Sequence, residues 1–333
     1  MRASLAELLS AGRTLLADGA TGTNYFERGL GAGDPPEFWN ADHPEKVRDL
    51  HQQFVDAGAD IILTNTFGCN RHRLKLHRAE GRVYELAKRA AEIACEVAEA
   101  APRSVVVAGS IGPTGELFEP LGALTENAAI ESFGELAEGL KAGGADIAWI
   151  ETMSAAEEIR AAATGALQAG LPYTATCSFD TAGRTMMGLL PGDLSHVFDG
   201  LAQPPVAIGA NCGVGASDIL VSLLAMTERD AHTYLISKGN CGVPYFAGTE
   251  AHYTGTPELM GRYAQLAVKA GARVVGGCCG TSPVHLAAMR KSLDELIAKP
   301  TIDDIIEAVG PLVNSAPSSG VPDRERRRGR RGE

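Results

Sequence analysis

Three cysteines lie in glycine-rich stretches that suit a metal site. Cys278 and Cys279 are adjacent in the segment 276–280 (Gly-Gly-Cys-Cys-Gly), and Cys212 lies far upstream in the segment 209–213 (Gly-Ala-Asn-Cys-Gly). Structural zinc sites usually have four protein ligands, whereas catalytic ones use three and keep a position for water or substrate. The spacing differs from the local Cys-x-x-Cys pairs of zinc ribbons, so two distant segments must converge to form an open site.

The alternative interpretation is that these cysteines are small core residues, because free cysteine is among the most buried residue types. The adjacent pair favours a metal site. Neighbouring side chains of a strand point to opposite faces, so two adjacent thiols reach one metal ion only where the strand has ended and the chain turns. Gly276, Gly277 and Gly280 permit such a turn.

The other four cysteines have different sequence contexts. Cys95 lies in a helical pattern and Cys177 in a strand pattern, so core packing is favoured for both. Cys69 and Cys241 are expected near the predicted site, where each is either a resting fourth ligand or a bystander.

The elements that must position these residues alternate between strand and helix patterns. Near-continuous apolar strands that alternate with amphipathic helices indicate a parallel sheet, and eight such units predict a single-domain α/β fold, the (β/α)8 TIM barrel. The weakest unit is the fifth, where 192–201 provides only a short helix. Ser154 and Ser282 are predicted to cap the helices that follow them. The predicted strands are 14–18, 61–65, 104–109, 146–151, 173–178, 205–211, 233–238 and 273–277, and the predicted helices include 46–57, 81–100, 125–143, 154–169, 216–228 and 257–270.

Polar residues end several of these strands. They are Asp18 in the first, Asn65 in the second, Glu151 in the fourth and Asn211 with Cys212 in the sixth. Because the C-terminal ends of barrel strands share one rim, these side chains are predicted to surround one site with Cys278 and Cys279. Two acids facing a thiolate-bound metal can hold the amino group of a substrate whose other end binds the metal. The alternative is that each acid caps the helix after its strand.

Length and composition favour one large cytoplasmic domain. The chain has 333 residues and 45% hydrophobic content, which suffices for a sizeable core. Seven cysteines without a disulfide-framework spacing, and a start without an apolar signal-peptide run, predict a reducing, cytoplasmic location. The sequence has no apolar stretch of about 20 residues, so no membrane association is expected. The net charge of −11 argues against nucleic acid as a partner, and an oligomer is compatible with the sequence.

The barrel domain is predicted to span residues 1–310, and residues 311–333 are predicted to form a disordered tail. Proline, serine and glycine residues there precede an arginine-rich end between Asp323 and Glu333. Such a composition cannot bury enough apolar surface to fold, so a solvated appendage is favoured over a docking arm.

Six segments together resemble the homocysteine S-methyltransferase family, from about Leu15 to about Leu296. They are 18–23 (Asp-Gly-Ala-Thr-Gly-Thr), 64–68 (Thr-Asn-Thr-Phe-Gly), 109–115 (Gly-Ser-Ile-Gly-Pro-Thr-Gly), 150–152 (Ile-Glu-Thr), 209–212 (Gly-Ala-Asn-Cys) and 277–281 (Gly-Cys-Cys-Gly-Thr). This family includes the betaine and S-methylmethionine enzymes and the homocysteine-binding barrel of cobalamin-dependent methionine synthase.

The resemblance implies an enzyme that transfers a methyl group to the thiolate of L-homocysteine and forms methionine. It implies a zinc ion, Zn2+, held by Cys212, Cys278 and Cys279. It also implies that Asp18 and Glu151 recognise the amino group of homocysteine, while backbone groups near Thr21 to Thr23 take its carboxylate. The candidate substrate-binding residues are Asp18, Thr21, Gly22, Thr23, Asn65, Glu151 and Asn211.

The methyl donor is left open by the sequence. The segments 65–68 and 112–117 look most like methionine synthase barrels, and Gly68 stands where betaine enzymes carry a tyrosine. No cobalamin or folate module follows the barrel in this sequence, which favours a small methyl-onium donor such as betaine. The aromatic residues Tyr25, Phe26, Phe38, Trp39 and Phe118 are candidates either for a cation–π donor pocket or for packing beneath the first loop.

Two other functions are compatible with the same residues. The first is a homocysteine-activating subunit of a split cobalamin-dependent methionine synthase, which receives its methyl group from a methyl-corrinoid protein in trans. The second is a barrel in which zinc is only structural.

Overall fold

The computed structural model describes residues 2–295, except 214, 230–232, 243 and 248–249. The predicted domain boundary at residue 310 and the predicted tail 311–333 lie outside the described residues. Within them, no helix is long and apolar enough to cross a membrane.

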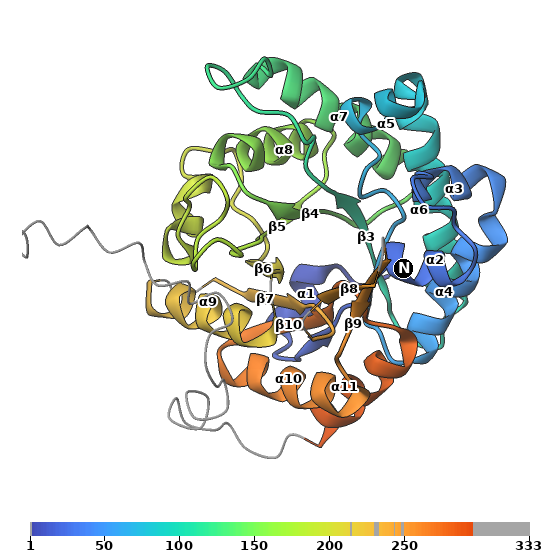
Figure 1. Ribbon diagram of the computed structural model, residues 1–333, viewed down its shortest axis with the longest axis vertical. Helices are drawn as coiled ribbons and strands as arrows, with labels where there is room; N and C mark the ends of the chain where they lie inside the picture. Colours follow the sequence, from blue (N-terminus) through green and yellow to red (C-terminus); the bar gives the residue numbers. More distant parts are fainter. Residues whose placement is uncertain (1, 214, 230–232, 243, 248–249, 296–333) are drawn as a thin grey trace, which may run out of the picture.

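Eight parallel strands form the central sheet, in the order β1-β10-β7-β6-β5-β4-β3-β2. The sheet closes because Ala17 forms a parallel bridge with Ile61, and the Asp18 N–H donates to the Ile61 carbonyl at 3.0 Å. Helices surround this ring of strands (Figure 1), so the predicted (β/α)8 TIM barrel is confirmed. The strands are β1 (Leu15–Leu16), β2 (Ile61–Leu63), β3 (Val106–Ile111), β4 (Ile147–Met153), β5 (Tyr173–Cys177), β6 (Ile208–Cys212), β7 (Leu235–Gly239) and β10 (Ala272–Gly277).

The helices pack their apolar faces against the outside of the barrel. They form one large core with the outward-facing strand residues, as Phe54 of α4 and Phe133 of α7 illustrate. A short antiparallel hairpin, β8 (Pro244–Ala247) and β9 (Glu250–Tyr253), follows β7. The α-helices are α1 (Leu5–Ser10), α2 (Gly22–Glu27), α3 (Trp39–Asp42), α4 (Pro44–Asp56), α5 (Arg71–Leu74), α6 (Val83–Ala100), α7 (Glu126–Ala142), α8 (Ala156–Gln168), α9 (Ala216–Arg229), α10 (Pro257–Lys269) and α11 (Pro283–Asp294).

The predicted helix starts hold for α11 and fail for α8. Ser282 directly precedes α11, and its N–H donates to Nδ1 of His285 at 3.2 Å. The N-cap of α8 is Ala155, and the Ser154 carbonyl instead accepts a hydrogen bond from the Thr185 hydroxyl at 2.6 Å. This bond ties the Ser154 backbone to the loop after β5, and the serine lies one residue before the N-cap position. The weak fifth unit contains a 3-10 helix, Pro191–Phe198.

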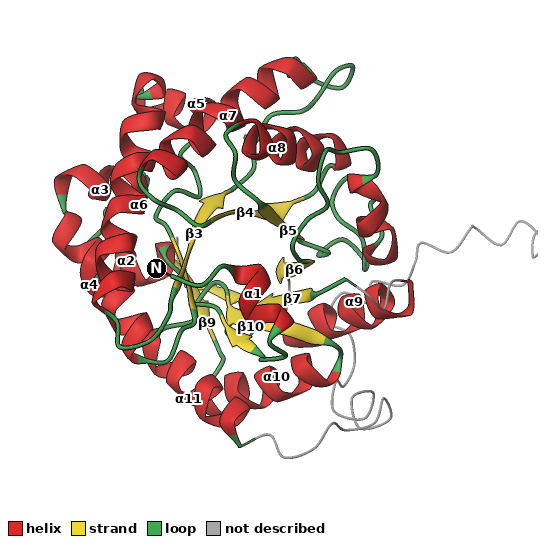
Figure 2. Cartoon of the chain, turned by 180° about the vertical axis from the view of Figure 1, so that it is seen from behind, coloured by secondary structure: helices red, strands yellow, loops and turns green. Residues whose placement is uncertain are grey.

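A second apolar cluster fills the inside of the barrel. Inward-facing residues such as Val106, Trp149 and Ile236 meet there, and each is fully buried. Leu5 and Leu9 of α1 join this cluster, and α1 lies across the end of the barrel seen in Figure 2. The interior is therefore packed and its N-terminal end is covered, which leaves the C-terminal rim for a binding site.

The close contact between β6 and β7 generates a stability prediction. A Cβ atom at Gly209 would overlap the carbonyl oxygen of Ile236, which lies opposite it in β7. We expect Gly209→Ala to destabilise the fold by about 1–3 kcal/mol, the usual cost of overpacking, because the two strands must separate. Thermal unfolding measures this change. Gly81→Ala is the control, since nothing lies within 4 Å of a Cβ there, and equal melting temperatures for the two variants would contradict the prediction.

Candidate metal and substrate site

The three predicted cysteine ligands converge at the C-terminal rim. Cys212 ends β6, Cys278 and Cys279 follow β10, and their sulfur atoms all lie within 4.8 Å of one another. Strand β7 explains this convergence, because its Gly239 lies opposite Cys212 on one side and Gly277 on the other. Among the described residues, this is the one group of three or more potential metal ligands.

Backbone contacts fix the turn that carries Cys278 and Cys279. The Cys278 N–H donates to the Gly239 carbonyl at 2.7 Å, and the Gly280 N–H donates to the Thr23 hydroxyl at 3.2 Å. Gly280 has a φ of 77°, a left-handed conformation that glycine adopts without steric cost. The start of α2 and the end of β7 therefore hold the two thiols in place from opposite sides.

Asn211 links the cysteine cluster to the end of β4. Its Oδ1 accepts hydrogen bonds from the Thr152 N–H at 2.8 Å and from the Thr176 hydroxyl at 2.7 Å. Its Nδ2 donates to the Thr152 hydroxyl at 2.7 Å and lies 3.8 Å from the Cys278 sulfur. Thr152 and Cys212 have φ values of 61° and 60°, which non-glycine residues adopt only when their surroundings impose it. Asn211 is thus placed to orient the site through its neighbours.

A buried cluster of charges lies beside the cysteines. Lys238 of β7 is 2% exposed, and its Nζ lies 2.7 Å from Oδ1 of Asp18. The other Asp18 oxygen accepts the Leu63 N–H at 2.7 Å. Glu151, at the end of β4, accepts a hydrogen bond from the Ser110 hydroxyl at 2.5 Å. Both acids therefore bond to residues of neighbouring strands. Neither is a helix cap, because the N-cap residues of α2 and α8 are Thr21 and Ala155.

The environment sets the charges of this cluster. Burial raises the pKa of Glu151, while Lys238 and Ser110 offset part of that rise. Burial by itself would lower the pKa of Lys238, but the charges of Asp18 and Glu151 outweigh it and leave that pKa raised. Lys238 is therefore protonated at neutral pH. Lys238 was not among the predicted site residues, although it ends the predicted strand 233–238 just as Asp18 and Glu151 end theirs.

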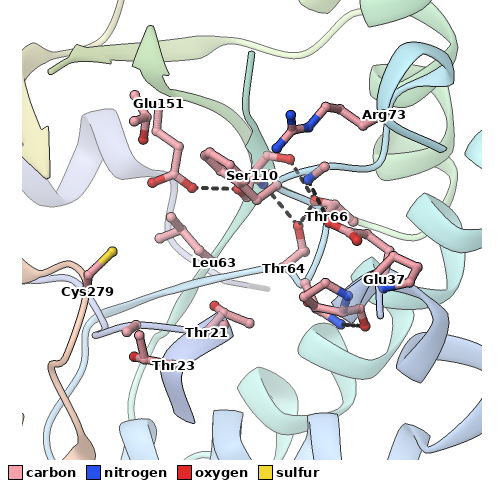
Figure 3. A pocket seen from close by; sticks show the side chains of 18 of the residues that line it. Thr21, Thr23, Glu37, Leu63, Thr64, Thr66, Arg73, Ser110, Glu151 and Cys279 are labelled. Carbon is pink, nitrogen blue, oxygen red and sulfur yellow. Dashed lines mark hydrogen bonds between the residues drawn. The ribbon is translucent and has the colours of Figure 1, made fainter. Parts of the chain in front are cut away.

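A cavity of about 550 Å³ joins these groups. Figure 3 shows Cys279 and Glu151 on one side of it, and Glu37 and Arg73 on the other. The predicted residues Thr21, Gly22, Thr23, Asn65 and Glu151 line it together with the three cysteines and Lys238, whereas Asp18 and Asn211 lie behind its wall.

Asn65 has structural partners at this wall. Its Nδ2 donates to the Pro36 carbonyl at 2.7 Å and to Oδ1 of Asn40 at 3.1 Å. Glu37 is 4% exposed and accepts the Gly68 N–H at 2.6 Å. Burial raises the pKa of Glu37. Asn65 therefore holds the outer loop of the cavity, and Glu37, Arg73 and Phe67 are lining residues that the sequence analysis did not find.

The structure distinguishes the two interpretations of the five aromatic residues. Of the five candidates, Phe26 alone lines the cavity, while Phe38 and Phe118 pack against the core from its edge. Tyr25 and Trp39 are buried with ring centroids 5.0 Å apart, and Lys46 covers Trp39 with its Nζ 4.3 Å from the ring centroid. Packing, the alternative interpretation, therefore describes four of the five residues, and Phe26 is the exception. Apolar burial decided the outcome, and aromatic type alone does not reveal it.

The other cysteines are not part of the cluster. Cys69 is fully buried with its sulfur 3.6 Å from the Val83 carbonyl. Cys241 is buried as well, although its N–H donates to the Cys279 carbonyl at 2.8 Å. Cys95 in α6 and Cys177 in β5 are core residues, as predicted.

Residues 15–293 match the protein-family model described as homocysteine S-methyltransferase. The chain belongs to the homocysteine S-methyltransferase family. Curated relatives include the methionine synthases of Mycobacterium tuberculosis (28% identical over 96% of this chain) and Mycobacterium leprae (30% identical over 83% of this chain). The chain spans only 28% and 24% of the lengths of these two relatives.

Solved structures of the same fold include the homocysteine methyltransferase MmuM from Escherichia coli. Its oxidized form aligns with a TM-score of 0.71 and 24% identity, covering 85% of this chain and 97% of that one. Its metallated form aligns with a TM-score of 0.70 and 24% identity, covering 86% of this chain and 98% of that one. Both comparisons support the barrel assigned to this family member.

The cysteine cluster predicts a proton release on metal binding. The hydrogen bond with Cys278, together with burial, raises the pKa of Cys212 to about 12, and the contact with Cys212 raises that of Cys279 to about 11. The pKa of Cys278 is also raised. All three thiols should be protonated in the metal-free protein at neutral pH, so we expect a divalent metal ion to release about three protons on binding.

Calorimetry in buffers of different ionisation enthalpy counts these protons. Metal affinity should rise with pH between about pH 6 and pH 8, because protons compete with the metal for the thiolates. Cys177→Ala is the control and should release the same number. Release of fewer than one proton would mean that the thiols are already ionised without metal.

Proposed function

We propose that this family member catalyses zinc-dependent methyl transfer to the thiolate of L-homocysteine, which gives methionine. The observation that carries the proposal is the cluster of Cys212, Cys278 and Cys279 at one end of a cavity that also exposes the Glu151 carboxylate. One small amino acid can then bind the metal through its thiol and Glu151 through its amino group.

The three cysteines fit a catalytic zinc site. Three close sulfur atoms supply the protein ligands, and all three line the cavity, so the fourth position would face the substrate. Zinc bound there would lower the pKa of the homocysteine thiol, so that homocysteine is present as its nucleophilic thiolate at neutral pH. The rest of the chemistry depends on how the chain orients the two substrates.

Named residues of the chain would hold homocysteine in a reactive position. Glu151, fixed by Ser110, receives the amino group, and the backbone N–H groups of Thr21, Gly22 and Thr23 receive the carboxylate. Asn65 and Asn211 keep the neighbouring loops in place through the bonds described above. Such positioning converts a bimolecular reaction into one between aligned groups, which can supply a large part of the rate.

We propose a small methyl-onium compound such as betaine as the donor. The cavity extends past the homocysteine position to Phe26, Phe67 and the buried carboxylate of Glu37. Aromatic faces and a carboxylate both stabilise a cation, and the volume leaves room for a second small molecule.

A methyl-corrinoid protein that acts in trans is the second candidate donor. It is supported by the relatives named methionine synthase, which are several times longer than this chain. For either donor, free thiol ligands require a reducing environment, so we place the protein in the cytoplasm.

The zinc assignment leads to a prediction about metal content. Protein loaded with zinc should contain one ion per chain, and Cys212→Ala, Cys278→Ala or Cys279→Ala should each lower zinc affinity at least about 100-fold, because one of three ligands is lost. Elemental analysis after dialysis measures the content. Cys95→Ala is the matched control and should keep its zinc. Full zinc occupancy in Cys279→Ala would contradict the three-ligand site.

The donor assignment is tested by turnover of the purified protein. With zinc and homocysteine, we expect methionine to form with at least one of betaine, dimethylsulfoniopropionate and S-methylmethionine, as detected by mass spectrometry. Cys279→Ala should be inactive with the same donor. Absence of turnover with every onium donor, together with methionine formation from a methylated corrinoid protein, would establish the split-synthase function instead.

A further inference from the structure

Two of the three charged groups beside the cysteine cluster line the cavity. Lys238 and Glu151 line the cavity, whereas Asp18 lies behind Lys238. One Asp18 oxygen is bound to the Lys238 ammonium group and the other to the Leu63 N–H, both at 2.7 Å. An amino group that enters the cavity therefore meets Glu151 directly and finds Asp18 already paired.

Lys238 is held in this position by its surroundings. Its side chain is 2% exposed, and its Nζ lies 5.8 Å from the ring centroid of Trp149 in the packed barrel interior. Separation of Lys238 from Asp18 would leave two buried charges without a partner, which is strongly unfavourable. The ammonium group of Lys238 is thus a permanent part of the site.

The charges of the three groups leave one negative charge for the substrate. When Asp18 and Glu151 are both ionised they contribute two negative charges, and the Lys238 ammonium group, 2.7 Å from Asp18, neutralises one of them. A substrate amino group beside Glu151 neutralises the second, whereas a thiol without an amino group leaves this buried charge balanced only in part, by Lys238 and the Ser110 hydroxyl. Sites with unpaired buried polar groups reject such analogues strongly.

We propose that Lys238 is a specificity-determining counter-ion that removes Asp18 from substrate recognition, so that Glu151 alone selects an acceptor thiol with an amino group. This inference rests on the proposed function. It makes Asp18 a positioning residue, in contrast to the expectation from the sequence that both acids hold the amino group.

Recognition of the amino group by Glu151 alone and recognition by both acids predict different effects of substitutions on homocysteine binding. Asp18→Asn alone leaves the Lys238 ammonium without its partner, so it competes with the substrate for Glu151. Asp18→Asn combined with Lys238→Met removes the ion pair as a unit and keeps Glu151. Glu151→Gln keeps the ion pair and the hydrogen bond from Ser110, and removes the negative charge of Glu151.

Calorimetric binding to the zinc-loaded full chain tests this. The ligands are L-homocysteine and 4-mercaptobutanoate, which is the same thiol acid without the amino group. We expect the unaltered protein to prefer homocysteine at least about tenfold, and Glu151→Gln to bring the two affinities within about threefold of each other. Asp18→Asn should weaken homocysteine at least about tenfold, and the double variant should regain affinity and preference to within about threefold of the unaltered protein.

Lys141→Met is the control, because Lys141 donates to the Gly170 carbonyl on the surface and should leave both affinities unchanged. A preference retained in Glu151→Gln, or lost in the double variant, would overturn the inference, because Asp18 or Lys238 would then contact the acceptor. Thermal unfolding and zinc content verify that each variant is folded. Glu151→Gln keeps the test decisive if the Asp18 variants do not fold. Failure of the unaltered protein to bind homocysteine would instead refute the proposed function.

Discussion

The pairing of β7 with both β6 and β10 is the contact on which the site depends. Gly239 at the end of β7 lies opposite Cys212 and Gly277, and this common neighbour brings three thiols from distant segments within 4.8 Å. The close approach of β6 and β7 at Gly209 leaves no room for a side chain. The registry of these strands therefore also sets the positions of the three thiols, because a slip of one residue would turn each side chain to the opposite face of the sheet.

The same strand introduces the charge that organises the substrate side of the cavity. Lys238 lies opposite Asn211 in β6 and Gly276 in β10, so it emerges between the two segments that carry the cysteines. A buried ammonium group is tolerated only with partners of opposite charge, and these are Asp18, which follows β1, and Glu151 in β4. The metal ligands and the amino-group site are therefore set by one strand and its neighbours.

Two of the four described non-glycine residues with a left-handed backbone conformation line the cavity. Thr152 and Cys212 both adopt left-handed backbone conformations, and Asn211, which precedes Cys212 in the chain, makes two hydrogen bonds to Thr152. The apolar interior around Trp149 and the cover provided by α1 stabilise the barrel beneath them. A rigid, well-packed base can support such local strain at the rim, which is where a barrel of this type builds its functional sites.

The sequence by itself determined the barrel, the family and the three thiols. Near-continuous apolar strand segments and helical apolar spacing are local signals, and adjacent cysteines between glycines leave few structural alternatives. Only the tertiary structure decided which polar side chains face the cavity. Asp18 and Lys238 both end apolar strands, but their pairing across the barrel places one behind the wall and the other in it. Likewise Trp39 is covered while Phe67 lines the cavity, because burial depends on neighbours that the sequence alone does not bring together.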